Sequence, residues 1–174
     1  MKLIDTIMPV LAIVAAPVLT SCGEDEPDTP AKDNYQSVTV GYYLDLSEDY
    51  YYFYDVNVIY TDGNGELMRG PLSKNQDFGY TIPVAKLPAN IRFALELTAK
   101  TPLPPIEINR TYTFSNKSSI AIVGNKDDGT KEPRNIDTRY FEFEVSSDNV
   151  AAFIAEEPEM IIGPYEYSTT EFKK

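Results

Sequence analysis

Apolar and polar side chains alternate without a break over residues 90–100, where the apolar set is Ile91, Phe93, Leu95, Leu97 and Ala99. In a β-strand, a period of two places one set on one face and the other set on the opposite face. An α-helix would scatter the same apolar residues around its axis, so this segment is predicted to be a strand with one face on a hydrophobic core. Three prolines in residues 101–105 end it, because proline cannot donate to a β-ladder.

The same kind of pattern precedes this strand. Residues 38–46 alternate in the same way, and residues 51–61 are rich in aromatic and β-branched side chains, which favour strands. The second run leads into Asp-Gly-Asn-Gly at 62–65, whose Asn-Gly pair favours a tight hairpin turn. We expect a short return strand, residues 66–69, because Gly70 and Pro71 interrupt it.

Further β-type segments follow, separated by polar residues at 115–118 and 124–137. The first polar stretch predicts a break between two strands, and the second predicts a loop. The expected strands are residues 78–84, 106–114, 119–123, 140–145 and 160–167.

Residues 146–157 have a helical pattern instead. Ser147 or Asp148 would cap a short helix there, because such side chains accept hydrogen bonds from free N–H groups of the first turn. The apolar residues of this helix are Val150, Phe153 and Ile154.

Short strands joined by turns, without a long amphipathic helix, predict an all-β sandwich in preference to a barrel. Ile106 and Tyr112 resemble the tyrosine corner of immunoglobulin-like and fibronectin type III domains, in which an aliphatic residue lies six positions before a tyrosine. The resemblance covers fewer than ten residues. We therefore expect one immunoglobulin-like β-sandwich of about seven to nine strands, with at most one short helix near the C-terminus.

The N-terminus resembles a bacterial lipoprotein signal. Residues 7–19 are almost entirely apolar but too short for the roughly 20 residues that cross a bilayer as a helix. A basic Lys2 precedes them, as in a secretory signal peptide. Leu19, Thr20 and Ser21 then precede Cys22, the chain's single cysteine. This order resembles the lipobox, which implies cleavage before Cys22, lipidation of its thiol and anchoring to a membrane. A free cysteine after an ordinary signal peptide is the alternative.

Three acidic residues lie just behind this cysteine: Glu24, Asp25 and Glu26. They resemble the surface-export signal of lipoproteins from Bacteroides-type bacteria, which implies an outer-membrane protein that faces the cell exterior. They also suit a solvated linker, since such a composition buries too little apolar area to fold. The expected organisation is a signal peptide at 1–21, the lipidated cysteine and acidic tether at 22–34, and the β-sandwich at 35–174.

Charge and residue types limit the chemistry. A net charge of −12 argues against nucleic acid, because an acidic chain releases few counterions from phosphates. The chain has no histidine, which excludes histidine-based triads and imidazole zinc ligands. Residues 62–66 offer alternating oxygens, but Leu67 and Ser73 stand where a calcium loop needs glycine and glutamate. We expect no enzyme, no metal and no cofactor.

An aromatic run, Tyr-Tyr-Tyr-Phe-Tyr at residues 50–54, is the unusual feature of the sequence. On a strand, Tyr52 and Tyr54 would share the core face, whereas Tyr51 and Phe53 would point outward. Tyrosine offers a flat apolar ring and a hydroxyl, which suits sugars or protein surfaces. Tyr51 and the nearby Tyr43 are therefore candidate ligand contacts. Packing of these rings in the core is the alternative, because strands favour tyrosine in any case.

Two functions fit these features. The first is a lipid-anchored binding or accessory module at the cell surface, without catalysis, that captures glycan or protein. The second is a structural or anchoring subunit of a surface assembly, such as a pilus or an outer-membrane complex. Exposed coplanar tyrosines in a groove would favour the first function, and a long uncovered edge strand beside an apolar patch would favour the second.

Overall fold

The computed structural model describes residues 34–172, except for the side chains of residues 135 and 136. The predicted signal peptide, the lipobox residues, Cys22 and the acidic residues 24–26 lie outside the described residues. The same holds for all of the predicted tether except its last residue, Asn34.

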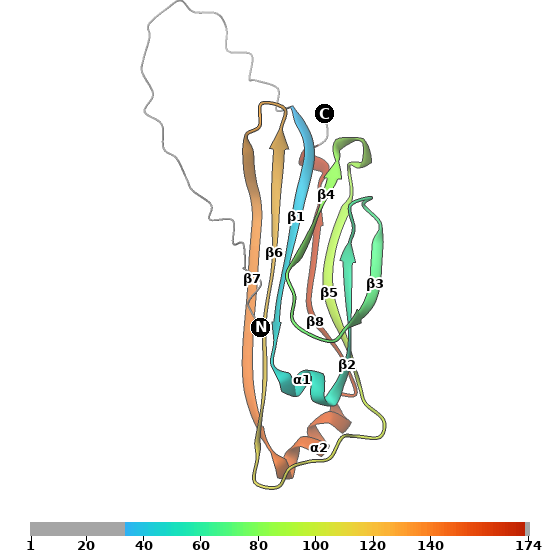
Figure 1. The fold of residues 1–174 in the computed structure, drawn as a ribbon, viewed down its shortest axis with the longest axis vertical. Helices are drawn as coiled ribbons and strands as arrows, with labels where there is room; N and C mark the ends of the chain where they lie inside the picture. Colours follow the sequence, from blue (N-terminus) through green and yellow to red (C-terminus); the bar gives the residue numbers. More distant parts are fainter. Residues whose placement is uncertain (1–33, 173–174) are drawn as a thin grey trace, which may run out of the picture. The chain divides into compact units, whose positions relative to one another are not determined.

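Eight strands form two antiparallel sheets of four strands each (Figure 1). The first sheet contains, in spatial order, β4 (Phe78–Pro83), β1 (Tyr35–Leu46), β6 (Thr111–Lys126) and β7 (Lys131–Ser146). The second contains β3 (Leu67–Leu72), β2 (Tyr54–Thr61), β5 (Asn90–Ala99) and β8 (Glu159–Ser168). The predicted all-β sandwich of seven to nine strands is confirmed.

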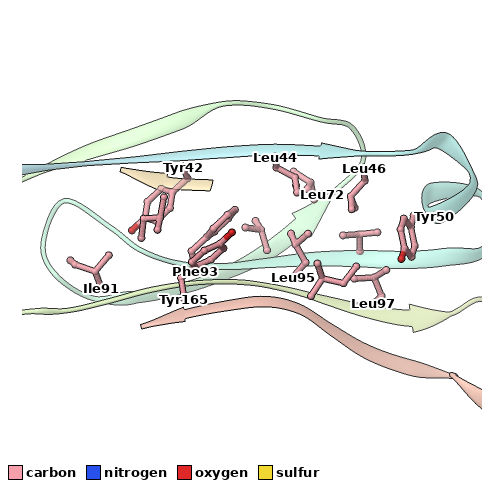
Figure 2. Packing of buried hydrophobic residues seen from close by; sticks show 14 of the residues in the cluster. Tyr42, Leu44, Leu46, Tyr50, Leu72, Ile91, Phe93, Leu95, Leu97 and Tyr165 are labelled. Carbon is pink, nitrogen blue, oxygen red and sulfur yellow. The ribbon is translucent and has the colours of Figure 1, made fainter. Parts of the chain in front are cut away.

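The core lies between the facing sides of the two sheets (Figure 2). Ile91, Phe93, Leu95 and Leu97 of β5 are buried, as the alternation predicted. The same is true of β1, where every second residue from Val38 to Leu46 is buried. Burial of each such side chain stabilises the fold by about 1.5–3 kcal/mol, so these two strands anchor their sheets to each other.

Residues 51–53 were predicted to be the start of a strand, and that is wrong. They are the last residues of the helix α1 (Glu48–Phe53), and the strand begins at Tyr54. Glu48 and Asp49 lie in the first turn, where carboxylates interact favourably with the helix dipole. Asp49 also pairs with Arg110 at 2.6 Å and accepts the Thr113 N–H at 2.7 Å. These tertiary contacts outweigh the strand preference of the aromatic residues.

The hairpin after β2 is confirmed. Gly65 has a φ of +77°, and the Asp62 carboxylate accepts the backbone N–H groups of Asn64 and Glu66. The return strand does not stop at residue 69, because β3 continues through Gly70 and Pro71 to Leu72. A proline is tolerated there because β3 lies at the edge of its sheet.

The predicted break at 115–118 is wrong, and the predicted loop at 124–137 is too long, because only residues 127–130 lie outside the strands. Strands β6 and β7 are 16 residues each and form one long hairpin. Asn116 and Ser118 continue the alternation of β6 on the core side, and both are buried. Polar side chains in a strand do not end it when the ladder on both sides is intact, and β6 pairs with both β1 and β7.

The helix near the C-terminus is confirmed as α2 (Ser147–Glu156). Its N-cap is Ser146 rather than Ser147 or Asp148, and no side chain hydrogen-bonds the cap. Val150 and Ile154 are buried, and the Phe153 ring packs against Phe114. Two short 3-10 helices, η1 (Val84–Lys86) and η2 (Thr170–Phe172), complete the fold.

Tyr112 makes the contact that gives the tyrosine corner its name. Its side chain is fully buried, and its hydroxyl accepts the backbone N–H of Glu107 at 2.8 Å. Such a bond from a tyrosine back to the chain a few residues upstream fixes the path of the connection into the strand. Arg110 lies over the Tyr112 ring at 4.5 Å, so the same corner is tied to Asp49 of α1.

Candidate functional site

The two tyrosines that the sequence suggested as ligand contacts lie beside different hollows, and the side chain of Asn75 connects them. Tyr51 lies on α1, half-buried, and its hydroxyl donates to the Asn75 side chain at 2.8 Å. Burial, with a smaller contribution from Asp45, raises the pKa of Tyr51 to about 12. Tyr43 lies on β1 in a separate shallow hollow beside Asp45 and Asp77.

The predicted faces of the aromatic run are wrong where the chain is helical. Phe53 was expected to point outward with Tyr51, yet it is fully buried. Tyr54 is buried as predicted, whereas Tyr52 is half-buried and its hydroxyl donates to the Pro105 carbonyl. A period of 3.6 replaces the period of two in α1, so the faces cannot alternate there. The run mainly fills the core and does not form a platform of coplanar rings.

Three of the four sheet edges are protected against pairing with another chain. Strand β3 contains Pro71, and β4 is only six residues long and ends at Pro83. Strand β8 has a bulge, since Gly163 and Pro164 together lie opposite one residue of β5. Short strands, prolines and bulges are the devices by which natural sheets avoid edge-to-edge association.

The fourth edge, β7, is different in its second half. Pro133 and a bulge interrupt its first half, where Val123 pairs with Pro133 and Ile122 pairs with Asn135. Residues 137–146 contain no proline and pair with β6 in an unbroken register. No described strand pairs with the other side of β7. We call residues 137–146 the open edge (Figure 1).

Apolar side chains are exposed beside the open edge. Tyr140 and Phe141 of β7 are 62% and 43% exposed, and Ile161 of β8 is 66% exposed. Successive residues of a strand point to opposite faces, so Tyr140 lies on the outer face of its sheet and Phe141 on the inner face. Phe141 remains accessible because the gap between β7 and β8 at this level is not filled.

The gap between β7 and β8 is bridged by side chains at one end of the open edge and is unfilled toward the other end. Arg139 of β7 donates to the Pro164 carbonyl of β8 at 3.2 Å and lies over the Tyr165 ring at 4.4 Å. The Tyr167 hydroxyl donates to Asp137 at 2.9 Å. These contacts join the two sheets at the level of Asp137 and Arg139. Between Arg139 and α2 the sheets border an open hollow of about 470 Å³, which we call the seam cavity.

The seam cavity has apolar and charged walls, and two of its lining residues carry an unpaired polar atom. Phe141, Met160 and Ile162 contribute to the walls. Tyr50 and Asn116 also line it, and the Tyr50 hydroxyl and the Asn116 Oδ1 atom are the buried side-chain polar atoms in residues 34–172 that have no hydrogen-bond partner. Tyr50 is fully buried and Asn116 is 4% exposed. Burial raises the pKa of Tyr50, so its hydroxyl stays protonated and neutral at physiological pH.

The surroundings of the open edge are acidic. Residues 137–159 contain seven acidic side chains and one basic side chain, Arg139. Glu157 and Glu159 line the seam cavity itself, and Glu142 and Glu144 lie on the outer face of β7. Field lines from one sign of charge concentrate in such a hollow and attract the opposite sign.

Sequence reasoning did not find Asn116 or the open edge. The alternation of Tyr112 and Phe114, when it is extended past the predicted break, places Asn116 on the core face. This pattern is the sequence signal that could have identified Asn116. A buried amide needs partners, so an asparagine at a core position is itself a signal of a site. The open edge had no such signal, because edge position depends on strand order.

No helix within residues 34–172 is long and apolar enough to cross a membrane, and no group of metal-ligating side chains occurs in the same range. A scan against protein-family models, a search of curated proteins and a search of solved structures each found no match. The site is therefore characterised by its own geometry: a β-sandwich with one open edge, exposed aromatic residues beside it and an acidic seam cavity with two unpaired polar atoms.

Proposed function

We propose that this protein is a lipid-anchored binding protein of the outer membrane that faces the cell exterior and captures a partner polypeptide without catalysing a reaction. The partner adds a strand to the open edge of β7. The observation that carries this proposal is the ten-residue edge without proline or bulge, because unpaired backbone N–H and C=O groups are a template for another strand. Capture of a soluble protein and anchoring of a surface assembly both use this chemistry.

Protein capture has more support than glycan capture. Sugars would need exposed tyrosine rings in a common hollow, but Tyr51 and Tyr43 lie beside different hollows. The exposed rings, Tyr140 and Phe141, instead flank the open edge on opposite faces of the sheet. Aromatic residues beside a strand edge cover the side chains of an added strand on both faces. No metal or cofactor takes part in this function.

The anchor is tested by Cys22→Ala. Without the thiol there is no site for lipidation, so the variant is expected to remain unprocessed or to leave the outer membrane. Detergent phase separation of cell extracts measures this directly, since a lipidated protein enters the detergent phase. Full retention in the detergent phase with unchanged processing would contradict the anchor.

Surface exposure is tested separately by adding protease to intact cells that carry alanine at Glu24, Asp25 and Glu26, where we expect protection from cleavage.

Strand addition is tested by photocrosslinking in intact cells. A photoreactive phenylalanine analogue in place of Tyr140 is expected to form a discrete crosslinked species with one partner protein. The matched control carries the same analogue at Ile108, which is 86% exposed and lies in the connection between β5 and β6. We expect several-fold less crosslinking there, because Ile108 is not on an edge strand. Equal yields at both positions would contradict a partner at the open edge.

A further inference from the structure

The seam cavity lies where an added strand would place its inward side chains. Such a strand would run beside β7, and its side chains on the core face would lie next to Phe141, which lines the cavity. In strand addition the main chain supplies affinity and pockets for alternate side chains supply specificity. A strand added at the open edge would therefore place an inward side chain beside an existing hollow.

We propose that the seam cavity is an anchor pocket for one side chain of the added strand, with an apolar body and a neutral tip that both donates and accepts a hydrogen bond. This inference rests on the proposed strand addition. Tyrosine fits these requirements: its ring packs on Phe141 and Met160, while its hydroxyl donates to Asn116 Oδ1 and accepts the Tyr50 O–H. Both protein atoms are otherwise unpaired, and buried polar atoms in native proteins are nearly always hydrogen-bonded.

The size of the cavity supports a large side chain. At about 470 Å³ it exceeds the roughly 30 Å³ that one water occupies in the liquid many times over. Its walls combine apolar side chains with polar and charged ones, and polar groups at fixed positions in a pocket orient its ligand. The two unpaired atoms belong to the neutral side chains of Tyr50 and Asn116, which suits a hydroxyl tip, and the charged residues of the lining are Arg139, Glu157 and Glu159.

The outer face of the same strand is expected to be basic. Its outward side chains would lie across from Tyr140, Glu142 and Glu144, and opposite charges in such cross-strand pairs are favourable. A second copy of this chain is a poor occupant, because its own open edge carries the same acidic residues and the chain has a net charge of −12. The occupant we infer is therefore a polypeptide segment that alternates basic residues with apolar ones around a central tyrosine.

A synthetic peptide tests the pocket. The probe is fluorescein-labelled Lys-Val-Lys-Tyr-Lys-Val-Lys, and its partner probe has phenylalanine in place of tyrosine. Fluorescence polarisation measures both against the full-length protein in detergent. We expect the tyrosine probe to bind about threefold to tenfold more tightly, because it alone satisfies the two buried atoms. Tyr50→Phe and Asn116→Leu should each weaken the tyrosine probe by a similar factor and abolish the preference.

The matched control is Tyr112→Phe. Tyr112 is also fully buried, but its hydroxyl already bonds the Glu107 N–H. We expect Tyr112→Phe to lower the unfolding temperature and to keep the preference for the tyrosine probe. Tyr50→Phe should show the reverse, an unfolding temperature that is unchanged or slightly higher and a lost preference, since it removes no intramolecular hydrogen bond.

The results of these experiments distinguish a failure of the anchor pocket from a failure of strand addition. Equal binding of both probes by the unchanged protein, or a preference that persists in Tyr50→Phe and Asn116→Leu, would mean that the cavity holds only water and would overturn the anchor pocket. Strand addition would then still stand on the Tyr140 crosslink. Absence of binding by either probe also overturns the inferred occupant, and together with a failed Tyr140 crosslink it would overturn strand addition itself.

Discussion

Phe93→Ala is expected to lower the free energy of unfolding by about 3–5 kcal/mol, because removal of a buried aromatic ring loses its transfer free energy and leaves a cavity. Phe93 is 1% exposed, and its ring centroid lies 5.1 Å from that of Tyr42 in the facing sheet and 5.9 Å from that of Tyr165 (Figure 2). The substitution therefore removes a contact between the sheets as well as one within a sheet. Urea unfolding followed by circular dichroism measures the change.

Phe141→Ala is the matched control for this prediction. The same atoms are removed, but Phe141 is 43% exposed and lies beside an unfilled cavity. We expect a loss of at most about 1 kcal/mol, in line with substitutions away from a packed core. A loss at Phe141 as large as that at Phe93 would mean that the edge of the sandwich is packed as tightly as its centre, and would contradict an open seam.

Alkaline pH is expected to destabilise the protein strongly. Burial raises the pKa of Tyr54 to about 12 and raises the pKa of Tyr42 and Tyr50 as well. In the unfolded chain each tyrosine has a pKa of about 10. A raised pKa in the folded state means that stability is complete below pH 10 and is lost as the pH rises toward 12, because the unfolded chain releases these protons first.

The expected size of the effect follows from the three buried hydroxyls. By pH 11 each contributes a loss of about 1.4 kcal/mol, so these three groups alone should lower the free energy of unfolding by roughly 4 kcal/mol. Denaturant unfolding at pH 9, 10 and 11 measures the fall, and tyrosinate absorbance should rise together with unfolding. Tyr54→Phe should remove only part of the pH dependence, because Tyr51, whose pKa is also raised to about 12, contributes as well. A stability that stays constant from pH 9 to pH 11 would contradict the burial of these hydroxyls.

The strands with regular alternation were predictable from local sequence. In β5 and β1 every apolar position of the pattern is on the core side, because a period of two has only one arrangement on a half-buried strand. The hairpin at 62–65 and the helix α2 were predictable for the same reason, since turn residues and a helical pattern are local signals. These elements depend on neighbours in sequence and need little information from the rest of the chain.

The elements that were predicted wrongly depend on distant partners. The helix α1 forms where Asp49 meets Arg110 and Thr113, more than 60 residues away. The break at 115–118 does not occur because β6 has a partner strand on each side, which local polarity cannot reveal. In both cases a hydrogen-bonding partner supplied by the tertiary structure outweighs a weak local preference.

The features of the protein that bear on the candidate site also fall into two groups, those that local sequence predicts and those that depend on the tertiary structure. The sequence by itself determined the all-β class, the positions of most strands along the chain, the acidic charge and the resemblance of the N-terminus to a lipoprotein signal. Only the tertiary structure decided that β7 lies at an edge, that its second half has no protecting residue, and that Tyr50 of α1 and Asn116 of β6 meet at one cavity. Sheet order and edge position arise from long-range pairing, and no local pattern of side chains encodes which strand is left without a neighbour.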